Sequence, residues 1–306
     1  MKLLNESPDT DQLPVEPATV AATTDPVDQL NPALADAAAV EPQVNDFLEL
    51  DLPNELYLAI DKLGFTTSTA IQKEVLPYSL DGRDIIAQAQ TGTGKTAAFL
   101  ISVITYHLEH PEYDPRPAGT PFALIIAPTR ELVMQIAEDA ISLSLFTDLS
   151  VLSVVGGMDY ERQKNQLKGP IDIIIATPGR LLDFCRTGVI NLSRVETLII
   201  DEADRMLSMG FIPDVKSIIS KTPAKQKRQT QLFSATFSDD IKRLAASWTL
   251  DPVRIEVEPD QVAVDSVEQL VYLTSADQKF AVLYNLLQLD TVDRVIIFAN
   301  RRDETR

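Results

Sequence analysis

Apolar residues in this chain gather into short continuous runs, and each run is followed by a polar or glycine-containing cluster. Six runs have the length of a β-strand: residues 85–87, 122–127, 151–155, 171–176, 197–200 and 231–233. Most are continuous in Leu, Ile and Val rather than alternating, which is typical of strands buried on both faces of a sheet. Stretches with helical spacing, such as Leu132 to Leu145, lie between the runs. Alternating strands and helices predict an α/β fold with a doubly wound parallel sheet.

The polar clusters after these runs are expected to meet at one edge of the sheet. In a doubly wound sheet the ligand binds beyond the carboxyl ends of the strands. Those ends carry residues 89–96, 128–132, 156–157, 177–180, 201–204 and 234–236. The functional residues are therefore expected in these six clusters.

The first cluster, Ala89-Gln-Thr-Gly-Thr-Gly-Lys95-Thr96, has the composition of a phosphate-binding loop. Its two glycines let consecutive backbone N–H groups turn toward one point, and the helix expected behind them adds the positive end of its dipole. Lys95 would reach the outer phosphates of a nucleotide, and the Thr96 hydroxyl would bind Mg²⁺. Ala89 stands where the general pattern has its first glycine. A glycine-rich strand-to-helix turn without a ligand is the alternative.

The segment before this loop contains a candidate adenine site. Residues 48–63 have a helix-compatible pattern that ends at a glycine, and residues 69–76 have another that is expected to end before Pro77. The segment 64–72 joins the two patterns and ends at Gln72. The Gln72 amide offers a donor beside an acceptor, which matches the N7 and N6 edge of adenine. Phe65 or Phe47 would stack on the base; the alternative is a glutamine on a helix surface with no such role.

Two acids follow the run at 197–200. Asp201 stands at the end of a buried strand, where it is placed to hold Mg²⁺, usually through water, in a chain that also has a phosphate loop. Glu202 beside it would take a proton from the water that attacks the γ-phosphate, or orient that water. The alternative is that Asp201 caps the next helix.

Composition narrows the class of protein. The chain has 306 residues, of which 45% are apolar, and a formal net charge of −18, so only a local basic groove would hold nucleic acid. One cysteine, Cys185, excludes an internal disulfide, and two histidines, His107 and His110, are too few for a Cys/His metal site. The two histidines are expected at a helix end and in a loop, without a chemical role. The start turns polar too soon for a signal peptide and no apolar run approaches ~18 residues, which predicts a soluble cytoplasmic protein that does not enter a membrane.

The first 45 residues differ from the rest of the chain. They are rich in Pro, Asp, Glu, Ala and Thr, and Lys2 is their only basic residue. Such a segment cannot bury enough apolar surface to offset the entropy of ordering it, so residues 1–45 are predicted to be a disordered acidic extension. Binding a partner and remaining a solvated tail are both open as its role.

Taken together and in this order, seven segments resemble the successive motifs of the DEAD-box RNA helicases. They are residues 64–72, 89–96, 128–135, 156–157, 177–180, 201–204 and 234–236. They lie within residues 46–252, which would form the first of that family's two RecA-like lobes, a P-loop NTPase fold. Within the family, residues 204–213 and 254–260 look most similar to the bacterial RhlB type. Ser68 departs from the pattern, because the family usually has Pro there, and it is expected to loosen the turn more than the contacts.

The resemblance implies ATP and Mg²⁺ as the ligands of this lobe. Phe65 and Gln72 would read adenine, while Glu202, Lys95 and Asp201 would be catalytic. Thr96 and Asp201 would hold Mg²⁺, partly through water. The residues that would hold the phosphates are Gln90, Thr91, Gly92, Thr93, Gly94, Lys95 and Thr96.

The resemblance also implies an RNA-binding face and a coupling network. Small residues and backbone N–H groups allow close approach to phosphate, and two arginines supply charge without sequence preference. The residues that would touch the RNA backbone are Thr129, Arg130, Gly157, Thr177, Gly179 and Arg180. For each arginine an ion pair with a neighbouring acid, such as Glu131 beside Arg130, is the alternative. Ser234 and Thr236, hydrogen-bonding near Asp204, would couple hydrolysis to strand separation.

The last fifty residues are expected to leave this lobe. Residues 253–265 would be an interdomain linker, and residues 266–306 resemble the start of the second lobe, with strands at 267–273 and 294–299 and a helix at 278–287. The family's later motifs, including the arginines that the second lobe points at the γ-phosphate, lie beyond this sequence. An arginine of this kind is worth ~10³ to 10⁵ in rate in phosphoryl-transfer enzymes. This chain alone is therefore expected to bind ATP, to hydrolyse it slowly and not to unwind RNA.

The sequence thus predicts the ATP-binding lobe of an ATP-dependent RNA helicase, an ATP hydrolase that acts as a monomer on RNA. An RNA-binding or scaffold module that uses ATP only as a switch is the main alternative. A DNA helicase with a similar core and a P-loop small-molecule kinase are less favoured by the motifs. RNA-degradation and ribosome-assembly proteins are both open as partners.

Overall fold

The computed structural model describes residues 46–111, 116–257, 270–288 and 294–299. The predicted disordered extension, residues 1–45, lies outside this part of the chain. So do residues 258–265 of the expected linker. Within the described residues, none of the helices is both long enough and apolar enough to span a bilayer.

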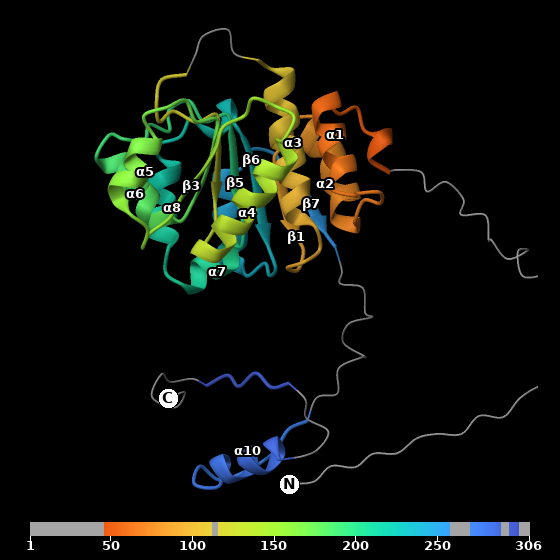
Figure 1. The fold of residues 1–306 in the computed structure, drawn as a ribbon, viewed down its shortest axis with the longest axis vertical. Helices are drawn as coiled ribbons and strands as arrows, with labels where there is room; N and C mark the ends of the chain where they lie inside the picture. Colours follow the sequence, from red (N-terminus) through yellow and green to blue (C-terminus); the bar gives the residue numbers. More distant parts are fainter. Residues whose placement is uncertain (1–45, 112–115, 258–269, 289–293, 300–306) are drawn as a thin grey trace, which may run out of the picture. The chain divides into compact units, whose positions relative to one another are not determined.

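A single parallel sheet forms the centre of the lobe (Figure 1), which confirms the predicted fold class. The strand order is β3-β4-β2-β5-β6-β1-β7, and every pair of neighbours is parallel. The strands are β1 (Ile85–Gln88), β2 (Ala123–Ile126), β3 (Val151–Val154), β4 (Ile173–Ala176), β5 (Thr197–Ile200), β6 (Gln229–Ser234) and β7 (Val253–Glu256). All four residues of β2, β4 and β5 are buried, as expected for strands covered on both faces.

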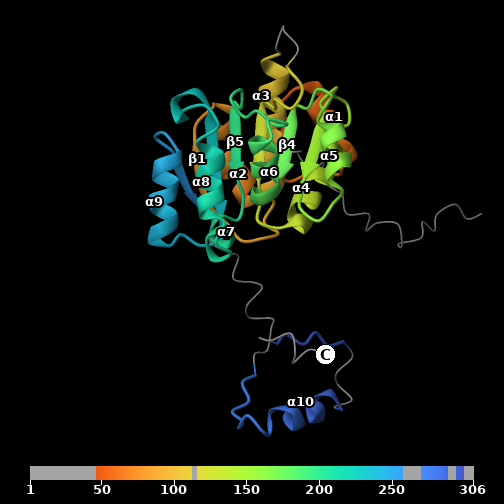
Figure 2. The same ribbon diagram turned by 90° about the vertical axis from the view of Figure 1, so that its left-hand side faces the viewer.

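Helices cover both faces of the sheet, as the two views in Figures 1 and 2 show. On one face α1 (Asn54–Lys62), α2 (Ala70–Leu80), α3 (Lys95–Glu109) and α4 (Arg130–Leu143) bury a core around Phe99 and Phe233. The other face carries a second core around Phe184 and Trp248, built by α6 (Pro178–Arg186), α7 (Ala203–Ser208), α8 (Ile212–Ile219) and α9 (Asp239–Trp248). The remaining short elements of this lobe are η2 (Asp46–Glu49), α5 (Tyr160–Gln166) and η3 (Lys225–Lys227).

The helix predicted to end before Pro77 continues to Leu80, so that prediction is wrong. Proline removes the N–H that would donate to the carbonyl four residues earlier, which normally ends a helix. Here burial outweighs the lost hydrogen bond, because Val75, Leu76 and Ser79 on both sides of Pro77 are buried. The two histidines lie as predicted, His107 in the last turn of α3 and His110 at its C-cap.

The boundary between lobe and linker also differs from the prediction. Residues 253–256 are not linker but β7, the edge strand that pairs with β1. The Val253 N–H donates to the Asp84 carbonyl at 2.8 Å, the Val257 N–H donates to the Gln88 carbonyl at 3.0 Å, and Ile255 is buried in the core. The sheet therefore extends four residues past the predicted end of the lobe, because an alternating edge strand that buries only one face needs only one neighbouring strand.

Of the second-lobe elements, the helix is confirmed as α10 (Lys279–Leu287). The two predicted strands are wrong in the residues that can be compared, since 270–273 and 294–299 have no regular structure. A strand forms only when a neighbour accepts its backbone hydrogen bonds. These two segments pair with no other strand within the described part of the chain, and their side chains are exposed.

Candidate active site

The phosphate loop joins β1 to α3, which begins at Lys95. Gly94 at the N-cap has a φ of 94°, and a Cβ there would lie 2.7 Å from the Gln72 amide nitrogen and 2.8 Å from the Thr69 hydroxyl. Glycine is therefore required at this position for both its backbone conformation and its lack of a side chain. Lys95 is buried, and its Nζ donates to the Ala89 carbonyl at 2.9 Å. The ammonium group thus lies inside the loop, behind the N-terminus of a 15-residue helix.

Gln72 links the adenine segment to the phosphate loop. Its Oε1 accepts from the Thr69 N–H at 2.8 Å, and its Nε2 donates to the Gly94 carbonyl at 3.1 Å. Because an amide oxygen has two lone pairs and an amide nitrogen two hydrogens, each atom can still make one more bond, as an adenine edge requires. The alternative of an exposed helix-surface glutamine is wrong, since only 5% of Gln72 is exposed.

Of the two predicted stacking rings, only one lies where a base could reach it. Phe47 is completely buried in the core, so the prediction that it stacks on adenine is wrong. Its ring packs 6.4 Å from that of Phe65, which is partly exposed. Phe65 lines a cavity of about 740 Å³ that also reaches Gln72, Lys95, Thr96 and the two acids after β5.

Asp201 is buried at the end of β5, and its Oδ1 accepts from the Glu202 N–H at 2.9 Å. Burial raises the pKa of this carboxyl to about 6, although the nearby charge of Lys95 acts in the opposite direction. The N-cap residue of α7 is Glu202, so the alternative that Asp201 caps the helix is wrong. A buried carboxylate that is costly to ionise and faces a cavity is a candidate ligand for a cation.

Glu202 has a left-handed backbone, with φ 50° and ψ 51°, at the start of α7. A non-glycine residue in this region is strained, and such residues cluster at functional sites. Its Oε2 lies 3.2 Å from the Arg205 Nη1. The turn therefore directs both carboxylates into the cavity while an arginine on the next turn of α7 holds the outer one.

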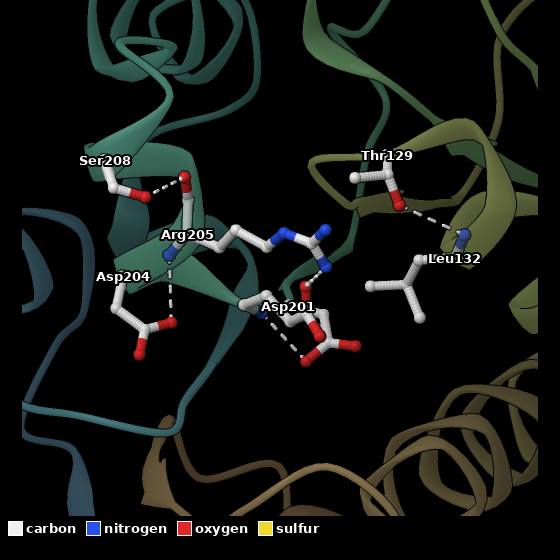
Figure 3. A network of polar contacts seen from close by, with 7 residues as sticks. Thr129, Leu132, Asp201, Asp204, Arg205 and Ser208 are labelled. Carbon is white, nitrogen blue, oxygen red and sulfur yellow. Dashed lines mark hydrogen bonds and ion pairs between the residues drawn. The ribbon is translucent and has the colours of Figure 1, made fainter. Parts of the chain in front are cut away.

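Asp204, three residues after Asp201, has a different environment. Its Oδ2 accepts from both the N–H and the hydroxyl of Thr236 at 2.9 Å, and its Oδ1 accepts from the Arg205 N–H at 2.9 Å (Figure 3 shows the last contact). The Asp204 N–H donates to the Ser234 hydroxyl at 3.2 Å, and that hydroxyl donates to the Thr236 carbonyl. The expected hydrogen bonding of Ser234 and Thr236 near Asp204 is thus confirmed. It ties the end of β6 to α7.

Among the predicted RNA-binding residues, Arg130 and Gly157 touch across the edge of the sheet. Gly157 has a φ of 74°, and a Cβ there would lie 2.6 Å from the Arg130 Nη1. Glycine at 157 therefore leaves room for the guanidinium. The alternative of an ion pair between Arg130 and Glu131 is wrong, since Arg130 forms no ion pair with any residue that the structure describes.

Arg180 on α6 rests on two aromatic rings. Its guanidinium carbon lies 5.4 Å from the centre of the Tyr160 ring and 5.8 Å from that of Phe184. Both terminal nitrogens donate to the Met158 carbonyl at 3.3 Å. The alternative of an ion pair with a neighbouring acid is thus replaced by cation–π contacts, which fix the guanidinium and keep its positive charge.

Thr129 and Thr177 are the N-cap residues of α4 and α6. The Thr129 hydroxyl accepts from the Leu132 N–H at 3.3 Å (Figure 3), and Gly179 lies exposed in the first turn of α6. Two helix N-termini therefore open beside Arg130 and Arg180 at the carboxyl edge of the sheet. Helix N-termini and arginines are the groups that proteins use to hold phosphates without reading bases.

The model of one family, the DEAD/DEAH box helicases, matches residues 69–244. The chain belongs to this family. ATP-dependent RNA helicase RhlB of Pseudomonas aeruginosa is 54% identical over 270 residues, which are 87% of this chain and 68% of that protein. The RhlB helicase of Shewanella amazonensis is 39% identical over 256 residues, which are 84% of this chain and 58% of that protein. The predicted similarity to the RhlB type is confirmed.

A solved structure supports the DEAD-box assignment of the fold. The crystal structure of a DEAD box protein from Methanococcus jannaschii is 34% identical, with a TM-score of 0.63, and the match covers 79% of this chain and 63% of that one. The chain thus spans less than two thirds of this solved relative.

Within this DEAD-box lobe, sequence reasoning missed several residues that shape the site. Arg205, which holds Glu202, follows the acid cluster directly, and its i,i+3 spacing on a helix was a usable signal. Gln163 is buried and bonds both the N–H and the carbonyl of Val155, which fixes the loop that ends at Gly157. Of the two rings under Arg180, Phe184 lies four residues later on α6, which was also a usable spacing signal, whereas Tyr160 comes from α5 and had none.

The donor set fits Mg²⁺ bound with a nucleotide. The described residues contain no group of three or more His, Cys, Asp or Glu side chains that would enclose a metal ion. Mg²⁺ needs no such cage, since it usually takes one or two carboxylates and completes its shell with phosphates and water. Asp201 and Thr96 line the same cavity and would supply the protein ligands.

Proposed function

We propose that the protein is an ATP-dependent RNA helicase and that this chain carries its ATP- and Mg²⁺-binding lobe. The observation that carries the proposal is the strained turn at 201–202, which directs Asp201 and Glu202 into the cavity that Lys95 and Thr96 also line. Membership of the DEAD-box family and the RhlB relatives support the same activity. We assign residues 46–257 to this lobe, because β7 belongs to its sheet.

The phosphate side of the cavity binds and orients the nucleotide. Residues Gln90 to Thr96 point backbone N–H groups at the phosphates, and Lys95 neutralises their charge from inside the loop. When bound, Mg²⁺ would polarise the phosphate oxygens and offset the charge that develops on them. Asp201 and the Thr96 hydroxyl would hold it there. Phe65 and Gln72 would contact adenine at the other end of the cavity.

Glu202 acts on the attacking water. Its carboxylate lies at the cavity wall, where it would accept a proton from the water or orient it toward the γ-phosphate. Arg205 restrains this carboxylate through the 3.2 Å ion pair. The Asp201 carboxylate accepts a hydrogen bond from the Glu202 N–H. We assign Asp201 to the metal ion and Glu202 to the attacking water.

The network of Asp204, Ser234 and Thr236 would couple the nucleotide to RNA. It joins α7, which carries the catalytic acids at its start, to the segment after β6. Arg130 and Arg180, with Thr129, Gly157, Thr177 and Gly179, would hold the RNA backbone. We also propose that the protein is a monomer and that it lies in the cytoplasm. Size-exclusion chromatography and cell fractionation would test that part.

Steady-state ATP hydrolysis tests the function. Turnover is measured with and without single-stranded RNA, on this chain and on a chain extended through a complete second lobe. We expect RNA-stimulated turnover in the longer chain and slow turnover in the shorter one. If neither chain hydrolyses ATP although both bind it, the helicase is ruled out and an ATP switch or scaffold replaces it.

A further inference from the structure

Asp46 holds the turn that precedes the adenine segment. Its Oδ2 accepts three hydrogen bonds, from the Ser68 N–H at 3.0 Å, the Ser68 hydroxyl at 3.1 Å and the Lys73 ammonium at 3.1 Å. The Asp46 N–H donates to the Thr66 carbonyl at 3.2 Å. Residue 46 is thus bonded to the turn by both its backbone and its side chain.

Ser68 is the residue that makes this clamp possible. It is buried, and both of its donors point to the same carboxylate oxygen. A proline at this position would have neither an N–H nor a hydroxyl. The turn was expected to be loosened by this serine. The structure corrects that expectation, because Asp46 restrains the turn through bonds that proline cannot make.

The clamp continues into the nucleotide cavity through a chain of hydrogen bonds. The residue after Ser68 is Thr69, whose N–H donates to the Gln72 Oε1, and Thr69 and Gln72 form a reciprocal capping box. The Gln72 Nε2 in turn donates to the Gly94 carbonyl of the phosphate loop. Thr67, Thr69 and Gln72 line the cavity, whereas Asp46 does not. Asp46 therefore reaches the site only through other residues.

We propose that Asp46 is a positioning residue for the adenine end of the nucleotide site, acting through Ser68 on the turn 65–69. This inference rests on the proposed ATP-binding function. The clamp holds Phe65 and Gln72 in their binding geometry before the nucleotide arrives, which reduces the entropy lost on binding. The phosphate loop is held separately by Lys95 and Ala89, so the contribution of Asp46 belongs to the base and not to the phosphates.

The ion pair with Lys73 is the smaller part of this clamp. The Lys73 side chain is 56% exposed, and exposed pairs of this kind contribute little. The Ser68 contacts involve a buried partner, so they carry most of the effect. The same three donors, Lys73 first, hold the pKa of Asp46 below its ordinary value, so the carboxylate stays ionised near neutral pH.

The test compares Asp46→Ala with a matched control, Asp51→Ala, whose side chain is exposed a few residues further on. Dissociation constants are measured by calorimetry for ATP and for inorganic triphosphate, on the whole chain. Asp46→Ala is expected to weaken ATP binding by about five- to tenfold, the size of one net hydrogen bond. Triphosphate affinity should stay unchanged, and Asp51→Ala should change neither constant.

Substitutions of Ser68 give a second, independent test of the proposed role of Asp46. Ser68→Ala removes the hydroxyl donor and keeps the N–H, so it should weaken ATP by about two- to threefold. It serves in place of Asp46→Ala if the latter does not fold. In a Ser68→Pro background, which lacks both donors, Asp46→Ala should no longer alter the affinity for ATP. Additive losses in the double variant would overturn the proposed route through Ser68.

The remaining outcomes separate this inference from the proposed function. If the unsubstituted chain binds triphosphate and ATP, and Asp46→Ala leaves both unchanged, the positioning role is wrong and the ATP site stands. An equal loss for ATP and triphosphate would also overturn the inference, since it would mean a general effect on the fold. If the unsubstituted chain binds neither ligand, the ATP-binding function fails first and the inference fails with it.

Discussion

The carboxyl edge of the sheet has two sides that hold their charges in opposite ways. The nucleotide side carries Lys95 and Asp201, and the side proposed to bind RNA carries Arg130 and Arg180. On the nucleotide side Lys95 and Asp201 are buried, and the Lys95 ammonium already donates to a protein carbonyl. On the RNA side Arg130 is exposed, and Arg180 is supported by two rings and a carbonyl rather than by an acid. On the nucleotide side the burial of charged groups is unfavourable in free energy. On the RNA side no acidic side chain among the described residues neutralises the two arginines.

This difference follows from the ligands that each side would accept. A nucleotide with Mg²⁺ enters a cavity, so buried charges that are unfavourable alone become favourable once the ligand is bound. A nucleic acid lies on an open surface, where guanidinium groups must remain available to phosphates. In a chain of net charge −18, neutral supports such as Tyr160 and Phe184 hold an arginine without neutralising it. Substitutions on the two sides should therefore have distinct effects.

The largest effect is expected at Glu202. Glu202→Gln keeps the shape of the side chain but cannot accept a proton, so ATP turnover should fall by about 10² to 10⁴-fold. The affinity for ATP should stay within a few-fold. Steady-state kinetics and calorimetry on the extended protein measure the two quantities, with the exposed Glu161→Gln on α5 as control. Turnover that survives Glu202→Gln would assign the work on water to another group.

The next largest effect is expected at Asp201, whose ionised carboxylate lowers the free energy of unfolding in metal-free buffer. The folded-state pKa lies above the ordinary value of 3.8, so the ionised side chain destabilises the fold, and this cost appears as pH rises through about 4 to 6. Asp201→Asn should therefore raise the free energy of unfolding at pH 8 by up to about 3 kcal/mol. The gain should largely vanish near pH 4. Denaturant melts at the two pH values check this, and an equal gain at both would contradict the burial argument.

On the RNA side a smaller loss is expected for each arginine. Arg130→Gln and Arg180→Gln should each weaken single-stranded RNA by about tenfold and reduce the salt slope by ~0.7. ATP affinity without RNA should not change, in contrast to substitutions in the cavity. Fluorescence anisotropy at several salt concentrations measures both values. Arg243→Gln, which removes an exposed ion pair with Asp240, is the matched control.

The smallest effect is expected at Thr236, whose bonds to Asp204 join the nucleotide side to the RNA side. Thr236→Val removes the hydroxyl bond to Asp204 and keeps the backbone N–H bond. RNA stimulation of ATP turnover should fall by about three- to tenfold, the size of one net hydrogen bond. ATP affinity and RNA affinity, measured separately, should stay the same. A loss in either affinity would show that Thr236 belongs to one side only.

Continuous burial is what made the sheet predictable from sequence. Residues 197–200 were predicted to the residue, because the charged residues Glu196 and Asp201 mark both ends of this run. The strand at 253–256 was predicted to be linker, since an edge strand is partly exposed and carries charged residues. The strands expected at 267–273 and 294–299 had the right composition, but composition does not supply a neighbouring strand.

In the site, chemistry within one motif was predictable and contacts between distant motifs were not. Lys95 and Asp201 follow from short local patterns that a single strand end positions, whereas the bonds from Asp204 to Ser234 and Thr236 were expected only from the family resemblance. The exclusion of Phe47 from the cavity depends on how the core closes around it. The Asp46 contact with Ser68 joins residues 22 positions apart through one carboxylate oxygen, and no spacing rule indicates it.

The edge strand β7 also has a mechanical consequence. Its last ladder bond, from the Val257 N–H to the Gln88 carbonyl, lies one residue before Ala89, the residue whose carbonyl receives the Lys95 ammonium. The two strands are parallel, so a pull along the chain from residue 257 loads their hydrogen bonds in shear, all at once, rather than opening them one by one. Tension arriving from the C-terminal side would therefore be shared by the whole β1–β7 ladder, whose last bond lies at the base of the phosphate loop.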